Sequence, residues 1–232
     1  MSKVVNLNRF RKKKQREDKA KQADINRIRH GRTQVEKDRE RAERERASRL
    51  IEGKRLEPRA ATILTTARLR LEPFADSHLD ELQEMNGDPE VMRFITGRPQ
   101  TLEETREGIE RVKKRWAELG YAWWSFFEIG TGRIIGAGCI QHLGNDAANP
   151  LELGYRLRSD KWHQGFATEA ARAMAAFAFD MLDAKELTAI CDPENVASSK
   201  VMQRLGMRYR GVERWHDADC AVYAISRGDW KA

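Results

Sequence analysis

The spacing of apolar residues changes near residue 57 of the 232-residue chain. Residues 11–57 are almost entirely polar, and their few apolar side chains are too widely spaced to bury a core. Glu, Arg, Lys and Ala dominate this stretch, and opposite charges recur three and four residues apart, which favours a helix. We therefore expect residues 1–57 to form a basic helical or partly disordered arm. A linker at residues 58–65 would join it to a packed domain at residues 66–230.

In the packed domain, apolar positions alternate in some segments and recur with a helical period in others. The alternation predicts strands at residues 66–74, 121–129, 133–143, 149–158, 186–191, 207–215 and 220–227. The helical period predicts helices from Asp76 or Ser77 to Met85, at 91–95, from Thr101 to Gly120, from Gly165 to Leu182 and from Asn195 to Gly206. Glu104 stands three residues after Thr101, and the two form a capping box. The domain is expected to be α+β.

Charge is divided unevenly between the arm and the domain. Residues 1–60 hold 21 Lys and Arg against 10 Asp and Glu, a net charge of +11, whereas the rest of the chain holds 22 against 26, a net charge of −4. This asymmetry indicates an arm that contacts RNA, a ribosome or another anionic surface, and a solvated arm without a ligand is the alternative. The apolar positions do not sustain a heptad, which argues against helix pairing.

The cysteine pattern and the hydropathy exclude several protein classes. Cys139, Cys191 and Cys220 are an odd number without a CxxC spacing, which argues against a disulfide framework and against a zinc site. The first residues lack the apolar run of a signal peptide, and no segment approaches 18 consecutive apolar residues. We expect a cytoplasmic protein with no metal and no membrane partner.

The stretch KWHQGFATEA, residues 161–170, joins a predicted strand to a predicted buried helix. Gly165 lets the backbone approach a ligand closely, and the first turn of the following helix offers unpaired N–H groups. Because such helix starts attract phosphates, the stretch predicts a phosphate-binding loop, with an ordinary loop-to-helix junction as the alternative. The stretch differs from a P-loop and from a dinucleotide fingerprint, since neither Gly-Lys-Ser/Thr nor GxGxxG is present.

Four motifs in this order resemble those of the GNAT acetyltransferase superfamily: TARLRLEPF, GRIIGAGCIQ, LELGYRLRSDKWHQGFATEA and NVASSKVMQRLGM. The likeness covers roughly residues 62–230 and is greatest to the bacterial acetyltransferases of ribosomal-protein N-termini. It implies the GNAT fold, a mixed, mostly antiparallel central sheet of six to seven strands flanked by helices, with acetyl-CoA as cosubstrate. Residues 1–57, with VVNLNRFRK, HGRT and GKRLE, resemble a short family of basic bacterial proteins without an assigned function.

The resemblance also implies which residues bind acetyl-CoA. Main-chain amides of the loop would converge on the pyrophosphate, within the segment Trp162, His163, Gln164, Gly165, Phe166, Ala167 and Thr168. The backbone of Leu153, Gly154 and Tyr155 would pair with the pantetheine amides and hold the oxyanion of the tetrahedral intermediate. Asn195 would hydrogen-bond the cofactor. The loop departs from the family pattern at its start, where many members carry Arg or Gln in place of Trp162 and Gly in place of His163.

Two side chains are candidates for catalysis. An ammonium must lose a proton before it attacks, and Glu152 occupies the strand position where several family members carry a base. Ser198 matches the serine that the resembled branch uses toward the departing thiolate, because the tyrosine of many members is Met202 here. The alternative for Glu152 is a strand carboxylate paired with a surface arginine. The alternative for Ser198 is a serine that caps the helix or lies in its first turn. No Ser–His–Asp or Cys–His set suggests a covalent acetyl-enzyme, so we expect direct transfer in a ternary complex.

The acceptor half of the domain is less informative. Trp123, Trp124 and Phe126 could line the acceptor side, although such aromatic residues are more often core. The expected function is an N-acetyltransferase that moves an acetyl group from acetyl-CoA to a primary amine, either a protein N-terminal α-amine or a small-molecule amine. The alternative is a catalytically weak CoA-binding protein that its basic arm tethers to RNA or a ribosome.

Overall fold

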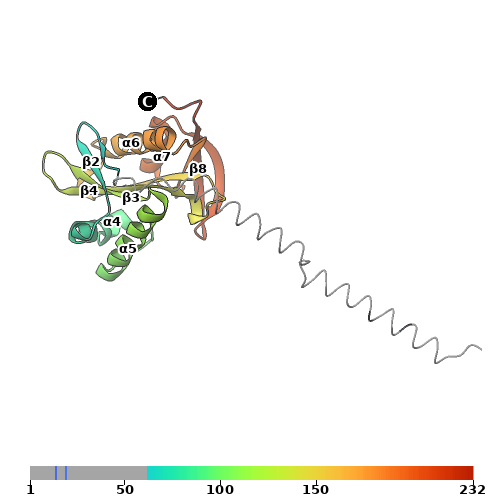
Figure 1. Cartoon of the computed structure of the whole chain (residues 1–232), viewed down its shortest axis with the longest axis horizontal. Helices are drawn as coiled ribbons and strands as arrows, with labels where there is room; N and C mark the ends of the chain where they lie inside the picture. The colour runs from blue at the N-terminus through green and yellow to red at the C-terminus, as the bar shows by residue number, and fades with distance from the viewer. Residues whose placement is uncertain (1–13, 15–18, 20–61, 232) are drawn as a thin grey trace, which may run out of the picture. The chain divides into compact units, whose positions relative to one another are not determined.

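The computed structural model describes residues 62–231 together with Lys14 and Lys19. The arm predicted for residues 1–57 and most of the predicted linker therefore lie outside the described residues. Within residues 62–231, one mixed β-sheet carries helices on both faces (Figure 1).

The sheet has eight strands in the order β1-β2-β3-β4-β5-β6-β8-β7. The strands are β1 Leu64–Thr65, β2 Leu69–Pro73, β3 Trp123–Glu128, β4 Ile134–His142, β5 Leu151–Leu157, β6 Glu186–Cys191, β7 Arg208–Trp215 and β8 Ala218–Ser226. All neighbours pair antiparallel except β5 and β6, so the expected mixed, mostly antiparallel sheet is confirmed. The strand beyond the expected six to seven is β1, which at two residues is too short to produce an alternating pattern.

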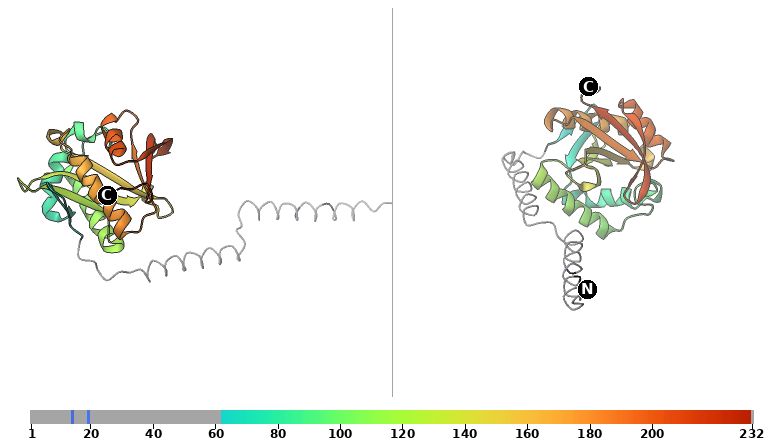
Figure 2. Two further views of the ribbon diagram at one scale, coloured as in Figure 1. Left: turned by 90° about the horizontal axis from the view of Figure 1, so that it is seen from above. Right: turned by 90° about the vertical axis from the view of Figure 1, so that its right-hand side faces the viewer.

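Helices form a layer on each face of the sheet. They are α3 Leu79–Asn86, α4 Pro89–Met92, α5 Leu102–Leu119, α6 Phe166–Met181 and α7 Val196–Arg204. Figure 1 shows α6 and α7 above the sheet and α4 and α5 below it, and Figure 2 shows the same layers from two other directions. Helix α5 begins at the predicted capping box, where Thr101 Oγ1 accepts the Glu104 N–H and the Glu104 carboxylate accepts the Thr101 N–H. It ends at Gly120, which is left-handed at φ 75°.

Strand β3 shows how alternation divides the core between the two faces. Trp124 and Phe126 are fully buried and pack with residues of α6, whereas Trp123 packs on the opposite face beside α5. Trp124 and Phe126 therefore belong to the core on the α6 face and do not line the opposite face. Trp123 is the one of the three that remains available to an acceptor site.

Candidate active site

Strands β5 and β6 diverge after a short parallel contact. Only Leu151 with Leu187 and Glu152 with Thr188 pair between them, while β5 stays paired with β4 as far as Leu157. The main chain from residue 153 onward therefore has no strand partner on its β6 side. Backbone N–H and C=O groups of strands need partners, so this edge can bind the amides of an extended ligand. The predicted backbone positions Leu153, Gly154 and Tyr155 all lie on it.

The predicted phosphate-binding loop lies between β5 and α6, as expected. Gly165 is the N-cap of α6 at φ 83°, and it provides no side-chain cap. The N–H groups of Phe166, Ala167 and Thr168 are those that an α-helix leaves without intrahelical partners in its first turn. A diphosphate fits these donors and the positive end of the helix.

Side chains of the loop hold its backbone in place. The Trp162 indole donates to the Leu157 carbonyl at 3.0 Å, and the Gln164 side-chain amide donates to the Asp160 carbonyl at 3.0 Å. His163 is exposed and has a left-handed backbone at φ 61°. The side chains of Trp162 and Gln164 thus brace the loop.

An ion pair that sequence reasoning missed fastens the loop to the start of the domain. Arg68 binds Glu169 of α6 through its Nε at 2.7 Å and its backbone N–H at 2.9 Å, and Thr66 Oγ1 donates to the same carboxylate at 2.6 Å. Arg68 Nη1 also donates to the Gln164 carbonyl at 3.0 Å, and its guanidinium lies 4.2 Å above the Phe166 ring. Nothing local in the sequence signals this contact, because about 100 residues separate the partners.

Glu169→Gln is expected to lower the free energy of unfolding by about 1–2 kcal/mol at pH 7. This value is at the low end for hydrogen bonds to charged groups, because the Arg68 side chain is half exposed and solvent screens its charge. Burial opposes ionisation of Glu169, but the hydrogen bonds from Thr66 and Arg68 outweigh it and lower its pKa. The stabilisation is therefore present above the unfolded-state pKa of about 4.3 and is lost as the pH falls through the lowered value. Urea unfolding at pH 7 and pH 3 measures this loss of stability.

Glu103→Gln is the control. It removes an exposed ion pair with Arg106 and should change the free energy of unfolding little. Equal losses in both variants would contradict a stabilising role of the Arg68–Glu169 contact.

Glu152 lies at the point where β5 and β6 diverge. Its side chain is buried, with 8% exposed, and faces the α3–α5 side together with its cross-strand neighbour Gln141. Gln141 Nε2 donates to Glu152 Oε2 at 3.3 Å, while Gln141 Oε1 accepts from Trp123 Nε1 and Arg115 Nη1, both at 3.2 Å. Burial raises the pKa of Glu152, against the smaller effects of Gln141 and the charge of His216. Among the described residues its partner is an amide, so the alternative of a carboxylate paired with a surface arginine is not what the structure has.

The residues predicted at the start of α7 have different neighbours. Asn195 Oδ1 accepts the Ser198 N–H at 3.0 Å and so caps α7. Ser198 Oγ lies 3.0 Å from the Tyr155 hydroxyl, which also donates to the Ser198 carbonyl. Met202 is buried in the core. Tyr155 therefore contributes a side chain that sequence reasoning missed, and burial raises the pKa of its phenol, which keeps it protonated.

The catalytic candidates lie on opposite faces of β5. Glu152 faces the α3–α5 side, whereas Tyr155 reaches Ser198 on the α6–α7 side. Between them runs the unpaired edge that begins at Leu153. A ligand bound along this edge would have a carboxylate near one side and two hydroxyl groups near the other.

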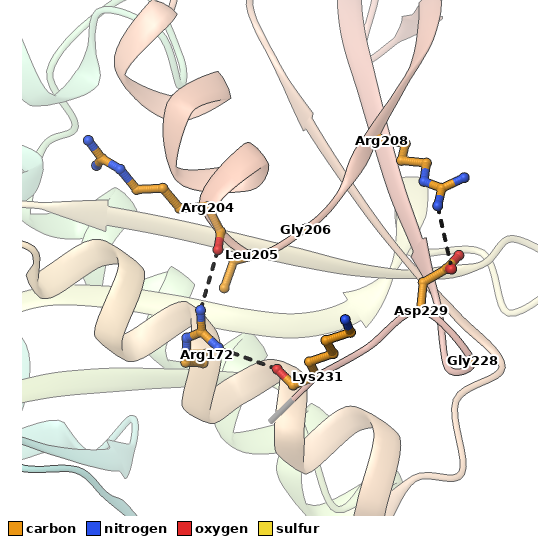
Figure 3. A pocket seen from close by; sticks show the side chains of 8 residues that line it. All are labelled: Arg172, Arg204, Leu205, Gly206, Arg208, Gly228, Asp229 and Lys231. Carbon is orange, nitrogen blue, oxygen red and sulfur yellow. Dashed lines mark hydrogen bonds and ion pairs between the residues drawn. The ribbon is translucent and has the colours of Figure 1, made fainter.

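A basic pocket of about 450 Å³ lies away from these residues, against the C-terminal end of α7 (Figure 3). It is lined by Arg172, Arg204, Leu205, Gly206, Arg208, Gly228, Asp229 and Lys231. Arg172 donates to the carbonyls of Arg204 and Lys231, and Arg208 pairs with Asp229 (Figure 3). Two of its cations therefore serve the packing of chain segments, and none of the predicted site residues lines the pocket.

The described residues offer little for other chemistries. Cys139, Cys191 and Cys220 are buried thiols, and burial raises the pKa of Cys191 to about 11, so it is a poor nucleophile at neutral pH. Within residues 62–231, no group of three or more His, Cys, Asp and Glu side chains is placed to hold a metal ion. In that same part of the chain, no helix has the length and apolar character needed to cross a membrane.

Comparison with known proteins agrees with the fold. The profile of the Acetyltransferase (GNAT) domain family matches residues 68–208, and that of a Domain of unknown function (DUF4169) matches residues 2–56. The Uncharacterized protein YkkB of Bacillus subtilis is 30% identical over 165 residues, which are 71% of this chain and 95% of that one. The Uncharacterized N-acetyltransferase YnaD of the same organism is 26% identical over 175 residues, 72% of this chain and 98% of that one.

A solved structure of another acetyltransferase in complex with coenzyme A has the same fold. The ribosomal L7/L12 alpha-N-protein acetyltransferase RimL in complex with coenzyme A superposes with a TM-score of 0.62 over 71% of this chain and 98% of that one. At 18% identity this likeness shows the fold alone. The family profile covers more than half of the chain, and the fold agrees with it. The chain therefore belongs to the GNAT acetyltransferase family, and it is an acyl-CoA-dependent acyltransferase.

Proposed function

We propose that this protein moves an acetyl group from acetyl-CoA to a primary amine by direct transfer in a ternary complex. The acceptor is a protein N-terminal α-amine or a small-molecule amine. The observation that carries the proposal is the position of Glu152, a buried carboxylate with a raised pKa at the point where β5 and β6 separate. A carboxylate there can take the proton that an ammonium must lose before its nitrogen attacks.

The residues around Glu152 divide the remaining work. In this proposal the amides of the loop at Gly165 hold the pyrophosphate, and the main chain of Leu153, Gly154 and Tyr155 binds the pantetheine and the oxyanion. Ser198, hydrogen-bonded to the protonated Tyr155 hydroxyl, supplies a proton toward the departing thiolate. Asn195 keeps a cofactor role through its side-chain Nδ2, because Oδ1 caps α7.

The basic arm and the location of the protein belong to the same proposal. The arm's excess of Lys and Arg supports contact with RNA or a ribosome, because phosphates attract such segments without regard to sequence. A cytoplasmic location is supported by three buried thiols that are unpaired in the described domain.

Turnover with a mixed panel of amines and peptides tests the function. We expect thiol release from acetyl-CoA to depend on an acceptor amine, and double-reciprocal plots at several acceptor concentrations to intersect, because both substrates must be bound together. Parallel lines would indicate a covalent acetyl-enzyme and overturn direct transfer. Tight CoA binding with no turnover on any acceptor, together with RNA binding that deletion of residues 1–57 removes, would instead support the tethered binding protein.

A further inference from the structure

Two arginines near Glu152 have no acidic partner among the described residues. Arg156 lies on β5, on the same face as Glu152 and Gly154, and its Nε donates to Asn86 Oδ1 at 3.1 Å. Its guanidinium lies 4.6 Å above the Trp123 ring. Arg115 of α5 reaches Gln141 at 3.2 Å. Within residues 62–231, no carboxylate lies within ion-pair distance of either guanidinium, whereas exposed arginines such as Arg133 have carboxylate partners.

The surroundings of Arg156 hold it in place without neutralising it. Asn86 is buried and donates to Thr105 Oγ1, which in turn donates to Gln83 Oε1 at 2.6 Å. Arg156 is partly exposed, and burial lowers its pKa to about 10, so it is still a cation at pH 7. A cation that is largely removed from water without a carboxylate is costly, which favours an anion that arrives from outside the protein.

The charges of Arg156, Arg115 and Glu152 meet around one point of the sheet. Cys139 stands opposite Gly154 on β4, on the same face. Burial and the charge of Glu152 raise the pKa of the Cys139 thiol, while the charges of Arg156 and Arg115 lower it. The three charged side chains therefore all influence the pKa of this thiol. The group carries a net charge of +1 when all three are ionised. A plain ammonium would raise this net charge to +2, whereas an ammonium that also carries a carboxylate would leave it at +1 and would supply the anion that the arginines lack.

We propose that the acceptor carries a carboxylate as well as the amine, and that Arg156 binds this carboxylate. This inference rests on the proposed function, because it assigns the class of acceptor for the same site. Arg156 and Glu152 are four residues apart on a strand, which is about 13 Å between their backbones. The amine and carboxylate of one α-amino acid are too close together to reach both. The acceptor is therefore an amine with a remote acidic group, found in a peptide with an acidic side chain beyond its first residue or in an ω-amino acid.

Matched pairs of acceptors test this specificity. The pairs are the tripeptide amides Ala-Glu-Ala and Ala-Gln-Ala, and 6-aminohexanoate with its carboxamide. We expect the wild type to prefer the acidic member of at least one pair by about 30-fold in kcat/KM, since breaking a buried charge pair typically costs 2 kcal/mol or more. Preference within the peptide pair indicates a peptide acceptor, and preference within the other pair indicates an ω-amino acid.

Variants of Arg156 decide whether this residue is responsible. Arg156→Gln should remove the preference, mainly by raising KM for the acidic acceptor while kcat/KM for the neutral acceptor stays the same. Arg156→Lys should restore part of the preference. Arg133→Gln, which removes an exposed arginine that has carboxylate partners, should keep the wild-type preference. Unchanged CoA affinity and thermal unfolding would show that the variants fold.

Two results separate this inference from the proposed function. Turnover without preference for either acid, or an Arg156→Gln variant that loses acid and neutral acceptors equally, would overturn the inference and leave the function intact. If no acceptor turns over, the function fails; calorimetric titration of Ala-Glu-Ala and Ala-Gln-Ala amides into the CoA-saturated protein then still reports the preference. The same titration is made with 6-aminohexanoate and its carboxamide, and equal affinities within both pairs would overturn the inference.

Discussion

Replacing Gly165 with glutamate is expected to reduce the affinity for acetyl-CoA by about 100-fold or more, because a like charge at a charged binding site costs several kcal/mol. The new carboxylate would stand at the first turn of α6, among the amides assigned to the pyrophosphate. An added Cβ would also approach Arg68 Nη2 to 3.4 Å, and the backbone there has a φ of 83° that L side chains rarely adopt. Calorimetric titration of the variant with acetyl-CoA measures the loss.

Gly132→Glu is the matched control. Gly132 lies in the turn between β3 and β4 at φ 69°, and a Cβ there would meet no atom within 4 Å. Both variants therefore have a similar backbone cost of about 1–2 kcal/mol, but only Gly165→Glu places a charge in the loop assigned to the pyrophosphate. We expect Gly132→Glu to bind acetyl-CoA like the wild type. Wild-type affinity in Gly165→Glu would show that the loop does not hold the phosphates.

Local signals in the sequence predicted most of the fold. The capping box at Thr101, the left-handed Gly120 and the alternation in β3 to β8 depend on residues within a few positions of one another, so one sequence suffices to recognise them. The short β1 carries no such signal, because two residues cannot show a period. The side to which Trp124 and Phe126 point was equally undetermined, since alternation separates two faces without saying which helices cover each.

The missed parts of the site come from contacts between distant segments. Arg68 binds Glu169, and Tyr155 binds Ser198. Each depends on the order of strands in the sheet, which the hydrophobic pattern does not contain. The loop at Gly165 was predictable because its donors, its glycine and its helix are contiguous. The proposed cofactor loop could thus be predicted from the sequence more completely than the proposed acceptor site, whose residues come from separate elements.

Glu152→Gln is expected to lower kcat by about 10²- to 10⁴-fold, the usual contribution of a positioned general base, with little change in acetyl-CoA affinity. In the wild type, kcat/KM should rise with pH as Glu152 ionises, at a pKa above the ordinary 4.3 because burial raises it. In the variant that step should vanish, and the remaining pH dependence should follow the acceptor amine alone. Steady-state rates from pH 5 to 9 measure both.

Glu152→Gln is also expected to affect stability, and it should not lower the free energy of unfolding at pH 7. A raised pKa means that native Glu152 binds its proton more tightly than the unfolded chain does, so the free energy of unfolding falls as the pH rises above about 4.3. Glutamine cannot ionise, and Glu152→Gln should therefore be at least as stable as the wild type at pH 7 while it is nearly inactive. Glu72→Gln, which alters a β2 carboxylate paired with Arg70, is the control and should retain activity. A Glu152→Gln variant that keeps full turnover, or that is inactive only because it unfolds, would exclude Glu152 as the base.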